Sequence, residues 1–273
     1  FILAKDGTPK ILEFNADTPT SLLEASVIQW QWKEDVFPEC DQFNGIHEGL
    51  VQSWKDIFPK KGEIHFAGAL ENNEDTGTLQ YLASTAMEAG FSTRVLDMQA
   101  LDLQNGRFFD PAGELVNRCF KLYPWEWMVD ESPDGCLAEM EWLEPIWKLV
   151  MSNKAILATL YELFPDSPYV LPCYLSRPRS GLFCKKPIFS REGHNVSVVD
   201  IRDWEEYVRI AETEGDYNTG AYVYQEYVEP TAYSGRYPVI GSWIIGGEAA
   251  GIGIRENRME VTDNLSEFVP HII

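Results

Sequence analysis

The sequence predicts a mixed α/β protein in which an α/β part is followed by an α+β part. The order strand, helix, strand between residues 63 and 97 predicts a small parallel sheet. After a proline-rich connector at residues 165–178, the apolar runs become short and strand-like. The chain has 273 residues, of which 45% are hydrophobic, so it can bury a sizeable core. We therefore expect both parts to form one compact body.

The first elements follow from turn and capping signals. Apolar-rich runs at residues 1–4 and 10–15 flank Asp6-Gly7, which is typical of a hairpin turn. Thr18 or Thr20 can cap the helix that follows. Because the chain begins at Phe1 inside an expected strand, without a methionine, we expect a fragment of a longer protein.

Segments whose apolar residues recur at helical spacing then alternate with strand-like segments. Between residues 46 and 58 the apolar side chains recur at helical spacing and form one face. A strand is expected at 63–69, a helix at 75–89 that stops at Gly90, and a strand at 92–97. This alternation is the basis of the predicted parallel sheet.

The remaining elements are less regular. Turn signals surround short strands near residues 105–113, and the acidic stretch 126–144 is expected to straddle a loop. Residues 142–163 predict one helix, or two separated near Ser152. The other expected elements are strands at 117–123, 182–189, 221–228, 239–245 and 249–255, and a helix near 204–211.

The charge excludes several function classes. The chain has 43 acidic and 22 basic residues, so its net charge is −21. This negative charge disfavours nucleic acid and anionic membrane surfaces as partners. No apolar run is long enough for a membrane span, and no signal peptide is visible. Five cysteines at irregular spacing favour a reducing, cytoplasmic setting, and four scattered histidines disfavour a histidine-built metal site.

Glu13 and Asn15 are candidate metal ligands. On a strand they share one face, and carboxylate and amide oxygens suit Mg²⁺ together with substrate phosphates. The alternative is a polar strand end in which residues 15–17 form a turn and cap the next helix.

Three later motifs could bind a nucleotide. Lys186 ends a strand before a loop that contains Gly193, an arrangement that suits phosphate, although an ordinary hairpin would have the same pattern. Gln225 and Glu226 end a strand that could contact an adenine edge or simply belong to a sheet. Arg255, at the end of an apolar strand, would be awkward to bury without an anion.

Two interpretations are open for an acidic stretch at residues 71–75 and for two tryptophan-rich stretches. The stretch 71–75 could bind an ammonium group, or it could complement the dipole of the helix that it begins. The tryptophan-rich pieces at 30–32 and 123–127 could line a cleft, but core packing is the commoner role.

Taken in order, these pieces resemble the glutathionylspermidine synthase family, closest to its shorter members without an amidase domain, described as acid–amine ligases. The resemblance implies a circularly permuted ATP-grasp fold with ATP and Mg²⁺ between two lobes. Residues 1–150 would be the substrate-side, pre-ATP-grasp-like region and residues 151–273 the nucleotide-binding lobes. The matching motifs are Leu12 to Ser21, Ser152 to Leu157, Lys186-Pro187 with Gly193, Tyr224-Gln225-Glu226, and Gly246-Gly247 through Arg255.

The resemblance also implies roles for particular residues. Glu13 and Asn15 fall on Mg²⁺ ligands whose third member, in an Arg-x-Asp motif, would precede Phe1, so we expect truncation at the N-terminus. Lys154 and Lys186 look like the lysines that face the phosphates. The other implied nucleotide-binding residues are the loop residues Gly193 and His194, the adenine hinge Gln225, Glu226, Tyr227 and Val228, and Arg255, which is also a catalytic candidate.

The implied reaction joins a small-molecule acid to an amine or polyamine through an acyl phosphate. Glu74 and Asp75 fall where the family binds the polyamine. The glutathionylspermidine synthases have a cysteine where Ser21 stands, so glutathione, another small peptide and a different carboxylate all remain candidate acids. The alternative function is a non-catalytic nucleotide- or polyamine-binding protein with the same fold.

Overall fold

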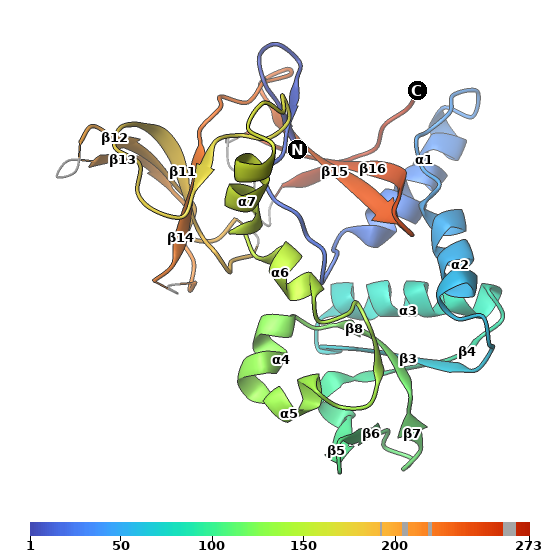
Figure 1. The fold of residues 1–273 in the computed structure, drawn as a ribbon. Coiled ribbons are helices and arrows are strands. Elements are labelled where there is room, and N and C mark those ends of the chain that lie inside the picture. The colour runs from blue at the N-terminus through green and yellow to red at the C-terminus, as the bar shows by residue number, and fades with distance from the viewer. Residues whose placement is uncertain (192, 204–206, 218–219, 259–265) are drawn as a thin grey trace. The chain divides into compact units, whose positions relative to one another are not determined.

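The chain divides into two compact units (Figure 1). The computed structural model describes residues 1–191, 193–203, 207–217, 220–258 and 266–273. Unit 1 comprises Phe1–Phe14, Val150–Gly241 and Ile254–Val269, and unit 2 comprises Asn15–Leu149, Ser242–Gly253 and Pro270–Ile273. One boundary lies at residue 150, as in the expected division, but Phe1–Phe14 belongs to unit 1, and Ser242–Gly253 and Pro270–Ile273 belong to unit 2.

Unit 2 is built on the parallel sheet that the sequence predicted. Its strand order is β4-β3-β8-β9, and every pair is parallel. The strands are β3 (Glu63–Gly68), β4 (Ser92–Asp97), β8 (Arg118–Leu122) and β9 (Glu141–Leu143). Ile64, Phe66 and Ala67 of β3 are fully buried, as expected for a central parallel strand covered on both faces.

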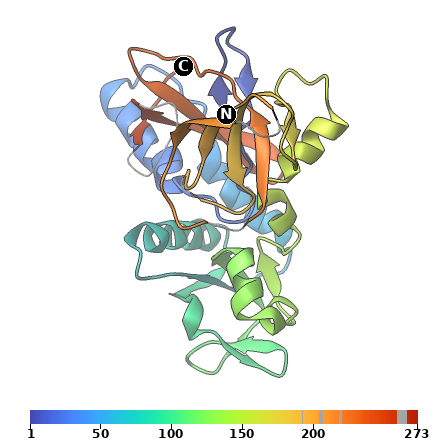
Figure 2. The same cartoon turned by 90° about the vertical axis from the view of Figure 1, so that its left-hand side faces the viewer.

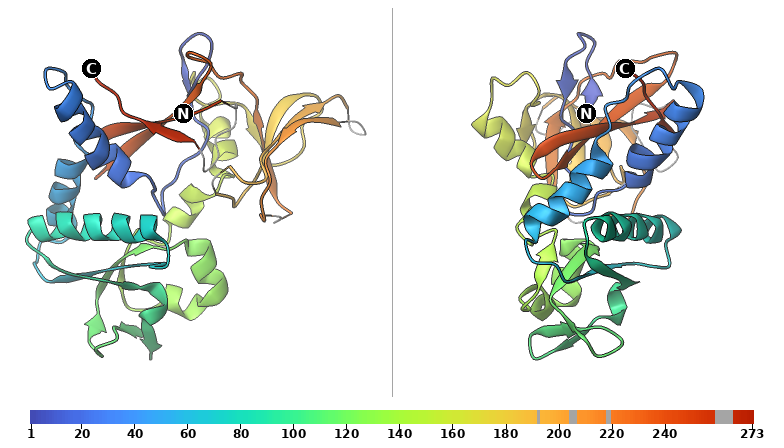
Figure 3. Two further views of the ribbon diagram at one scale, coloured as in Figure 1. Left: turned by 180° about the vertical axis from the view of Figure 1, so that it is seen from behind. Right: turned by 90° about the vertical axis from the view of Figure 1, so that its right-hand side faces the viewer.

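Helices α2 and α3 pack beside this sheet (Figure 3). Trp54 of α2 donates its indole N–H to Thr85 Oγ1 of α3 over 2.9 Å and stacks edge-on against Phe66 at 5.6 Å. The Asn72 side chain caps α3 by accepting from the Glu74 N–H. The helices of unit 2 are the π-helical turn η1 (Glu24–Ile28), α1 (Gln29–Val36), α2 (Ile46–Ile57), α3 (Asn73–Glu88), the 3₁₀ turn η2 (Met98–Ala100), α4 (Trp125–Glu131) and α5 (Pro133–Cys136).

A second, antiparallel sheet completes unit 2. It consists of β5 (Asp102–Gln104), β6 (Arg107–Phe109) and β7 (Leu115–Val116) in that order. Phe108 and Val116 of this sheet are buried in one cluster with Trp125 of α4. The short strands lie where the turn signals near residues 105–113 predicted them.

Unit 1 contains an antiparallel five-stranded sheet, which faces the viewer in Figure 2. Its order is β10-β14-β11-β12-β13. Leu157 of helix α7 packs on Cys173 and Val223 at one face of this sheet. The elements are the hairpin β1 (Ile2–Leu3) and β2 (Pro9–Lys10), α7 (Ile156–Leu163), β10 (Cys173–Tyr174), β11 (Gly181–Pro187), β12 (Ser197–Ile201), β13 (Tyr207–Glu212) and β14 (Tyr222–Glu226).

Three elements contain residues of both units, namely α6 (Lys148–Ser152), β15 (Tyr237–Ile245) and β16 (Glu248–Asn257). Strand β17 (Glu267–Val269) joins β15 and β16 in a sheet of order β15-β16-β17. No helix in the described part of the chain is both long and apolar enough to cross a membrane.

Several sequence expectations need correction. The second strand of the hairpin ends at Lys10 rather than residue 15, because the Ile11 N–H donates to Tyr169 O instead of pairing with β1. The acidic stretch 126–144 straddles a loop at residues 137–140, as expected, but it also contains helical turns before the loop and strand β9 after it. Of the two alternatives for residues 142–163, the structure has two helices, α6 and α7, separated after Ser152, but the first begins at Lys148 because residues 142 and 143 belong to β9.

The helix expected near residues 204–211 is also wrong where the structure describes it. Tyr207–Glu212 forms β13, which pairs antiparallel with β12 from Ile201↔Tyr207 to Ser197↔Glu212. Residues 204–206 lie outside the described part. Pairing with a neighbouring strand outweighs the local helical spacing here, because Tyr, Val and Ile favour strands.

Candidate nucleotide-binding and substrate sites

Two buried lysines meet a carboxylate in unit 1. Lys154 is 7% exposed and Lys186 is 6% exposed. Lys154 Nζ lies 3.2 Å from Glu13 Oε2 and donates to Ser190 O over 2.5 Å. The structure thus brings together three residues that the sequence analysis proposed, although they are far apart along the chain.

Strand pairing places Lys186 in this cluster. It lies on β11 opposite Val223 of β14. Its ammonium donates to Gln225 Oε1 over 2.7 Å and to Leu12 O over 3.1 Å. Burial lowers the pKa of the Lys186 ammonium below its usual value. An anion bound here would therefore stabilise its charged form.

Glu13 has the donor chemistry that magnesium prefers. Its side chain is 44% exposed, so the carboxylate can also be reached from solvent. Partial burial raises the pKa of this carboxyl, but the ammonium groups of Lys154 and Lys186 lower it more, and the net pKa lies below its usual value. Asn15, the other expected ligand, belongs to unit 2. Within the described residues, no three His, Cys, Asp or Glu side chains form a metal-binding group.

The loop after β11 begins at the lysine cluster. Ser190, whose carbonyl accepts from Lys154, opens the segment that leads to Gly193 and His194. Gly193 has φ +70°, which favours glycine, and its carbonyl accepts from Thr213 Oγ1 over 2.5 Å. The His194 N–H donates to Arg191 O over 2.9 Å.

The expected adenine hinge lies at the end of β14. The Glu226 N–H donates to Pro172 O over 2.7 Å, and the Tyr227 N–H donates to Leu182 O over 2.9 Å; Val228 follows the strand. Arg255 lies on β16, opposite Phe268 of β17, in a different sheet. The nucleotide-binding roles of these residues stay predictions.

The expected substrate residues belong to unit 2. Glu74 is exposed and Asp75 is half-buried in the first turn of α3. Ser21 directly precedes the first helix and has φ +60°, a strained value for a residue other than glycine. Asn15 is exposed in the segment before it.

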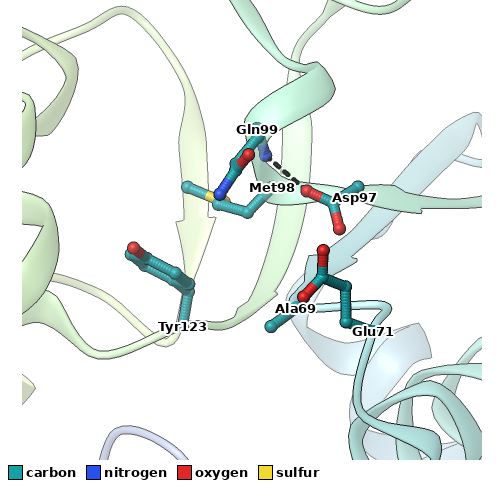
Figure 4. Close-up of a pocket in the computed structure, with 6 residues that line it drawn as sticks. All are labelled: Ala69, Glu71, Asp97, Met98, Gln99 and Tyr123. Carbon is teal, nitrogen blue, oxygen red and sulfur yellow. Dashed lines mark hydrogen bonds between the residues drawn. The ribbon is translucent and has the colours of Figure 1, made fainter.

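A pocket of about 210 Å³ opens at the carboxyl ends of the parallel strands (Figure 4). Asp97 Oδ1 accepts from the Gln99 N–H over 2.8 Å and Asp97 Oδ2 from the Leu70 N–H over 3.1 Å, so the carboxylate is held in place. Burial, followed by the hydrogen bond to Glu131, raises the pKa of Tyr123 to about 12. The pocket is lined by Ala69, Glu71, Asp97, Met98, Gln99 and Tyr123.

A buried ion pair supports the pocket edge. Lys121 of β8 donates to Asp17 Oδ1 and, over 2.9 Å, to Tyr123 O. Asp17 Oδ2 accepts from the Trp125 N–H over 2.7 Å, at the start of α4. The segment that contains Ser21 is thereby anchored to the end of β8.

Of the pocket residues, Glu71 and Tyr123 belong to the acidic and aromatic stretches that the sequence analysis named as candidates, whereas Asp97 was missed. Asp97 is the last residue of a parallel strand, where ligands commonly bind in α/β sheets, and that rule could have identified it. No sequence signal pairs Asp17 with Lys121, since 104 positions separate them.

The mixed α/β fold is similar to that of a solved glutathione synthetase like-effector from Globodera pallida, with a TM-score of 0.60 at 9% identity. That similarity covers 98% of this chain and 73% of the other. Residues 1–273 match the family model described as glutathionylspermidine synthase preATP-grasp, and the chain belongs to that family.

Two relatives illustrate this membership. A Haemophilus influenzae protein named "Putative acid–amine ligase" is 38% identical over 96% of this chain and 70% of its own length. The Escherichia coli bifunctional glutathionylspermidine synthetase/amidase is 26% identical over 97% of this chain. The chain spans 47% of that second protein.

Proposed function

We propose that the chain belongs to an ATP-dependent carboxylate–amine ligase with a circularly permuted ATP-grasp fold. The observation that carries the proposal is the meeting of Lys154, Lys186 and Glu13 in unit 1. Family membership adds relatives whose names denote the joining of an acid to an amine.

The lysine cluster suits a polyphosphate. The positive charge of Lys154 disfavours the charged form of the buried Lys186, because like charges repel each other. A bound triphosphate would relieve both this repulsion and the cost of burying ammonium groups. Glu13 is the residue of unit 1 that would hold Mg²⁺. The metal would supply further neutralisation of phosphate charge.

The proposed reaction has two steps. A carboxylate oxygen of the acid attacks the γ-phosphorus of ATP, and the bond to ADP breaks to leave an acyl phosphate. The amine nitrogen then attacks the acyl carbon, phosphate leaves, and the nitrogen loses a proton to give the amide. In this scheme the side chains of Lys154, Lys186 and Arg255 position and neutralise the phosphates, and none acts as a nucleophile.

The pocket of unit 2 is the proposed amine site. Glu71 and Asp97 place two carboxylates at its wall, which suits an ammonium group. A volume of about 210 Å³ suits one end of an alkyl amine rather than a whole polyamine. Glu74 and Asp75, at the start of α3, are proposed to attract the cation, and the segment at Ser21 to contact a small peptide acid such as a γ-glutamyl peptide.

ADP release by the full gene product tests the ligase proposal. With a panel of amines and γ-glutamyl peptides, we expect at least one pair to accelerate ADP release from ATP. No ATP turnover, or turnover that no acid–amine pair changes, would contradict it. In that case ATP-dependent thermal stabilisation alone would support the non-catalytic binding protein.

Adjacent lysines provide a matched test of the phosphate site. Lys186→Ala should abolish the increase in melting temperature caused by ATP. Lys185→Ala should retain it, because Lys185 points to the other face of β11 and its Nζ lies 3.8 Å from the Tyr222 ring centre. Equal shifts in both variants would remove Lys186 from the site.

Two glutamates provide the test of the amine site. Glu71→Gln should raise the KM for the amine and leave the KM for ATP unchanged, since Glu71 lines the pocket. Glu74→Gln, just outside the lining, should raise it less. A larger effect at Glu74 would place the amine at the start of α3 instead.

A further inference from the structure

Gln225 is a buried polar residue on an interior strand of the unit 1 sheet. It lies on β14 between Cys173 of β10 and Cys184 of β11, and only 2% of its surface is exposed. A buried amide is costly unless its oxygen and nitrogen both have partners. Its two partners therefore define what it can do.

Both ends of the Gln225 amide are engaged. Oε1 accepts from Lys186 Nζ over 2.7 Å, and Nε2 donates to Ile11 O over 2.8 Å. The chemistry of the partners fixes this orientation, because an ammonium only donates and a carbonyl only accepts. Rotating the amide by 180° would lose both hydrogen bonds.

This arrangement directs the charge of Lys186. The ammonium has three donors, and Gln225 Oε1 and Leu12 O accept from two of them among the described residues. The third donor is available for an anion. The same amide holds Ile11, two residues before Glu13, so it also ties the segment of the expected metal ligand to Lys186.

The engaged amide conflicts with one role expected from the sequence. To contact an adenine edge through its side chain, Gln225 would have to release Lys186 or Ile11. Its 2% exposure leaves no free side-chain surface for a base.

We infer that Gln225 is a positioning residue: its side-chain amide holds the Lys186 ammonium toward the phosphates and does not contact the base. This inference rests on the proposed nucleotide site. It differs from the adenine-hinge role in one measurable respect, which is whether the loss of Gln225 affects a ligand that has no base.

The test compares ATP, GTP and inorganic tripolyphosphate as ligands of the full gene product, with Kd measured by calorimetry. Gln225→Met keeps the length of the side chain and removes both hydrogen bonds. We expect this substitution to raise the Kd for ATP and the Kd for tripolyphosphate by similar factors, about tenfold. The ratio of the Kd values for ATP and GTP should stay unchanged. The matched control is Gln29→Met, which removes an amide that is 1% exposed in unit 2 and should leave all three affinities unchanged.

A pH series distinguishes positioning from a general loss of structure. In Gln225→Met the Lys186 ammonium loses its hydrogen bond to Gln225 Oε1, which favours the charged form. The affinity for tripolyphosphate should therefore be lost at a lower pH as the solution becomes alkaline. A carboxylate beside Lys186 should move this loss to higher pH in Gln225→Glu. Glu13, Lys154, Cys173, Cys184 and the amino group of Phe1 interact electrostatically with Lys186, and all variants share these residues. If Gln225→Met does not fold, the shift in Gln225→Glu decides the question.

The outcomes separate this inference from the proposed function. Two results would overturn the positioning role and leave the nucleotide site intact. One is a Gln225→Met variant that no longer binds ATP but still binds tripolyphosphate. The other is an unchanged pH for the alkaline loss of tripolyphosphate affinity in both variants. If the unaltered protein binds neither ATP nor tripolyphosphate, the proposed function itself fails.

Discussion

The buried pair Lys121–Asp17 provides the sharpest stability prediction. Both side chains are almost completely inaccessible, at 0% and 1% exposed. Lys121→Met keeps most of the aliphatic stem and removes the ammonium. The Asp17 carboxylate would then stay buried without its ion-pair partner, and among the described residues the Trp125 N–H would remain as its hydrogen-bond donor.

The expected loss follows from the cost of an unpaired buried charge. Breaking a buried ion pair from one side costs about 3–5 kcal/mol. That is a large part of the 5–15 kcal/mol that typically stabilises a domain. With a urea m-value of about 2 kcal/mol per molar, the midpoint should fall by about 2 M.

Urea unfolding followed by circular dichroism measures this change. The matched control is Lys5→Met, since the Lys5–Glu229 pair is 70% and 57% exposed and should contribute at most about 1 kcal/mol. Adding Asp17→Asn to Lys121→Met should recover part of the loss, because it removes the unpaired charge and keeps an acceptor for Trp125. A Lys121→Met midpoint as high as that of Lys5→Met would refute the reasoning.

Three further predictions concern unit 2. Burial raises the pKa of the Cys119 thiol from 9.0 to about 12. At a pH between these two values the thiol is ionised in the unfolded chain and neutral in the folded one. The contribution of this group to the free energy of unfolding should therefore fall by about 1.4 kcal/mol between pH 8 and pH 10. Urea titrations of Cys119→Ala should lack that part of the pH dependence, and an unchanged slope would contradict the assignment. Asn72→Ala should cost about 1 kcal/mol in thermal unfolding because it removes the cap of α3, whereas Asn73→Ala should cost less; equal losses would count against the cap. Gly68→Ala should cost about 1–3 kcal/mol, since a Cβ there would lie 2.9 Å from Leu79 Cδ1, while Gly49→Ala, in helix α2 with its nearest contact at 3.5 Å, should be neutral or stabilising; the reverse order of melting temperatures would be inconsistent with this packing.

The elements that the sequence predicted well are those with a strong local period. Helix α2 and strands β3 and β4 lie within a residue of their expected bounds. Their apolar spacing determines which face is buried, and that spacing is visible over a few turns or residues. Strand β13 was missed because its conformation depends on β12, a partner elsewhere in the chain.

The candidate site was only partly predictable for the same reason. The lysines at 154 and 186 were identified individually, from motifs in a consistent order along the chain. The hydrogen bond between Lys186 and Gln225 spans 39 positions, and nothing near either residue indicates it. It arises because antiparallel pairing of β11 and β14 places both side chains on one face of the sheet.

By itself, the sequence determined the class of secondary structure, the family resemblance and the scarcity of basic residues that makes the two lysines conspicuous. These properties are local or compositional, so they can be inferred without knowing which segments meet. Only the tertiary structure decided that Gln225 holds Lys186 and that Lys121 holds Asp17. Burial removes these polar groups from water, and they must then find partners wherever the fold brings a complementary group within hydrogen-bond distance.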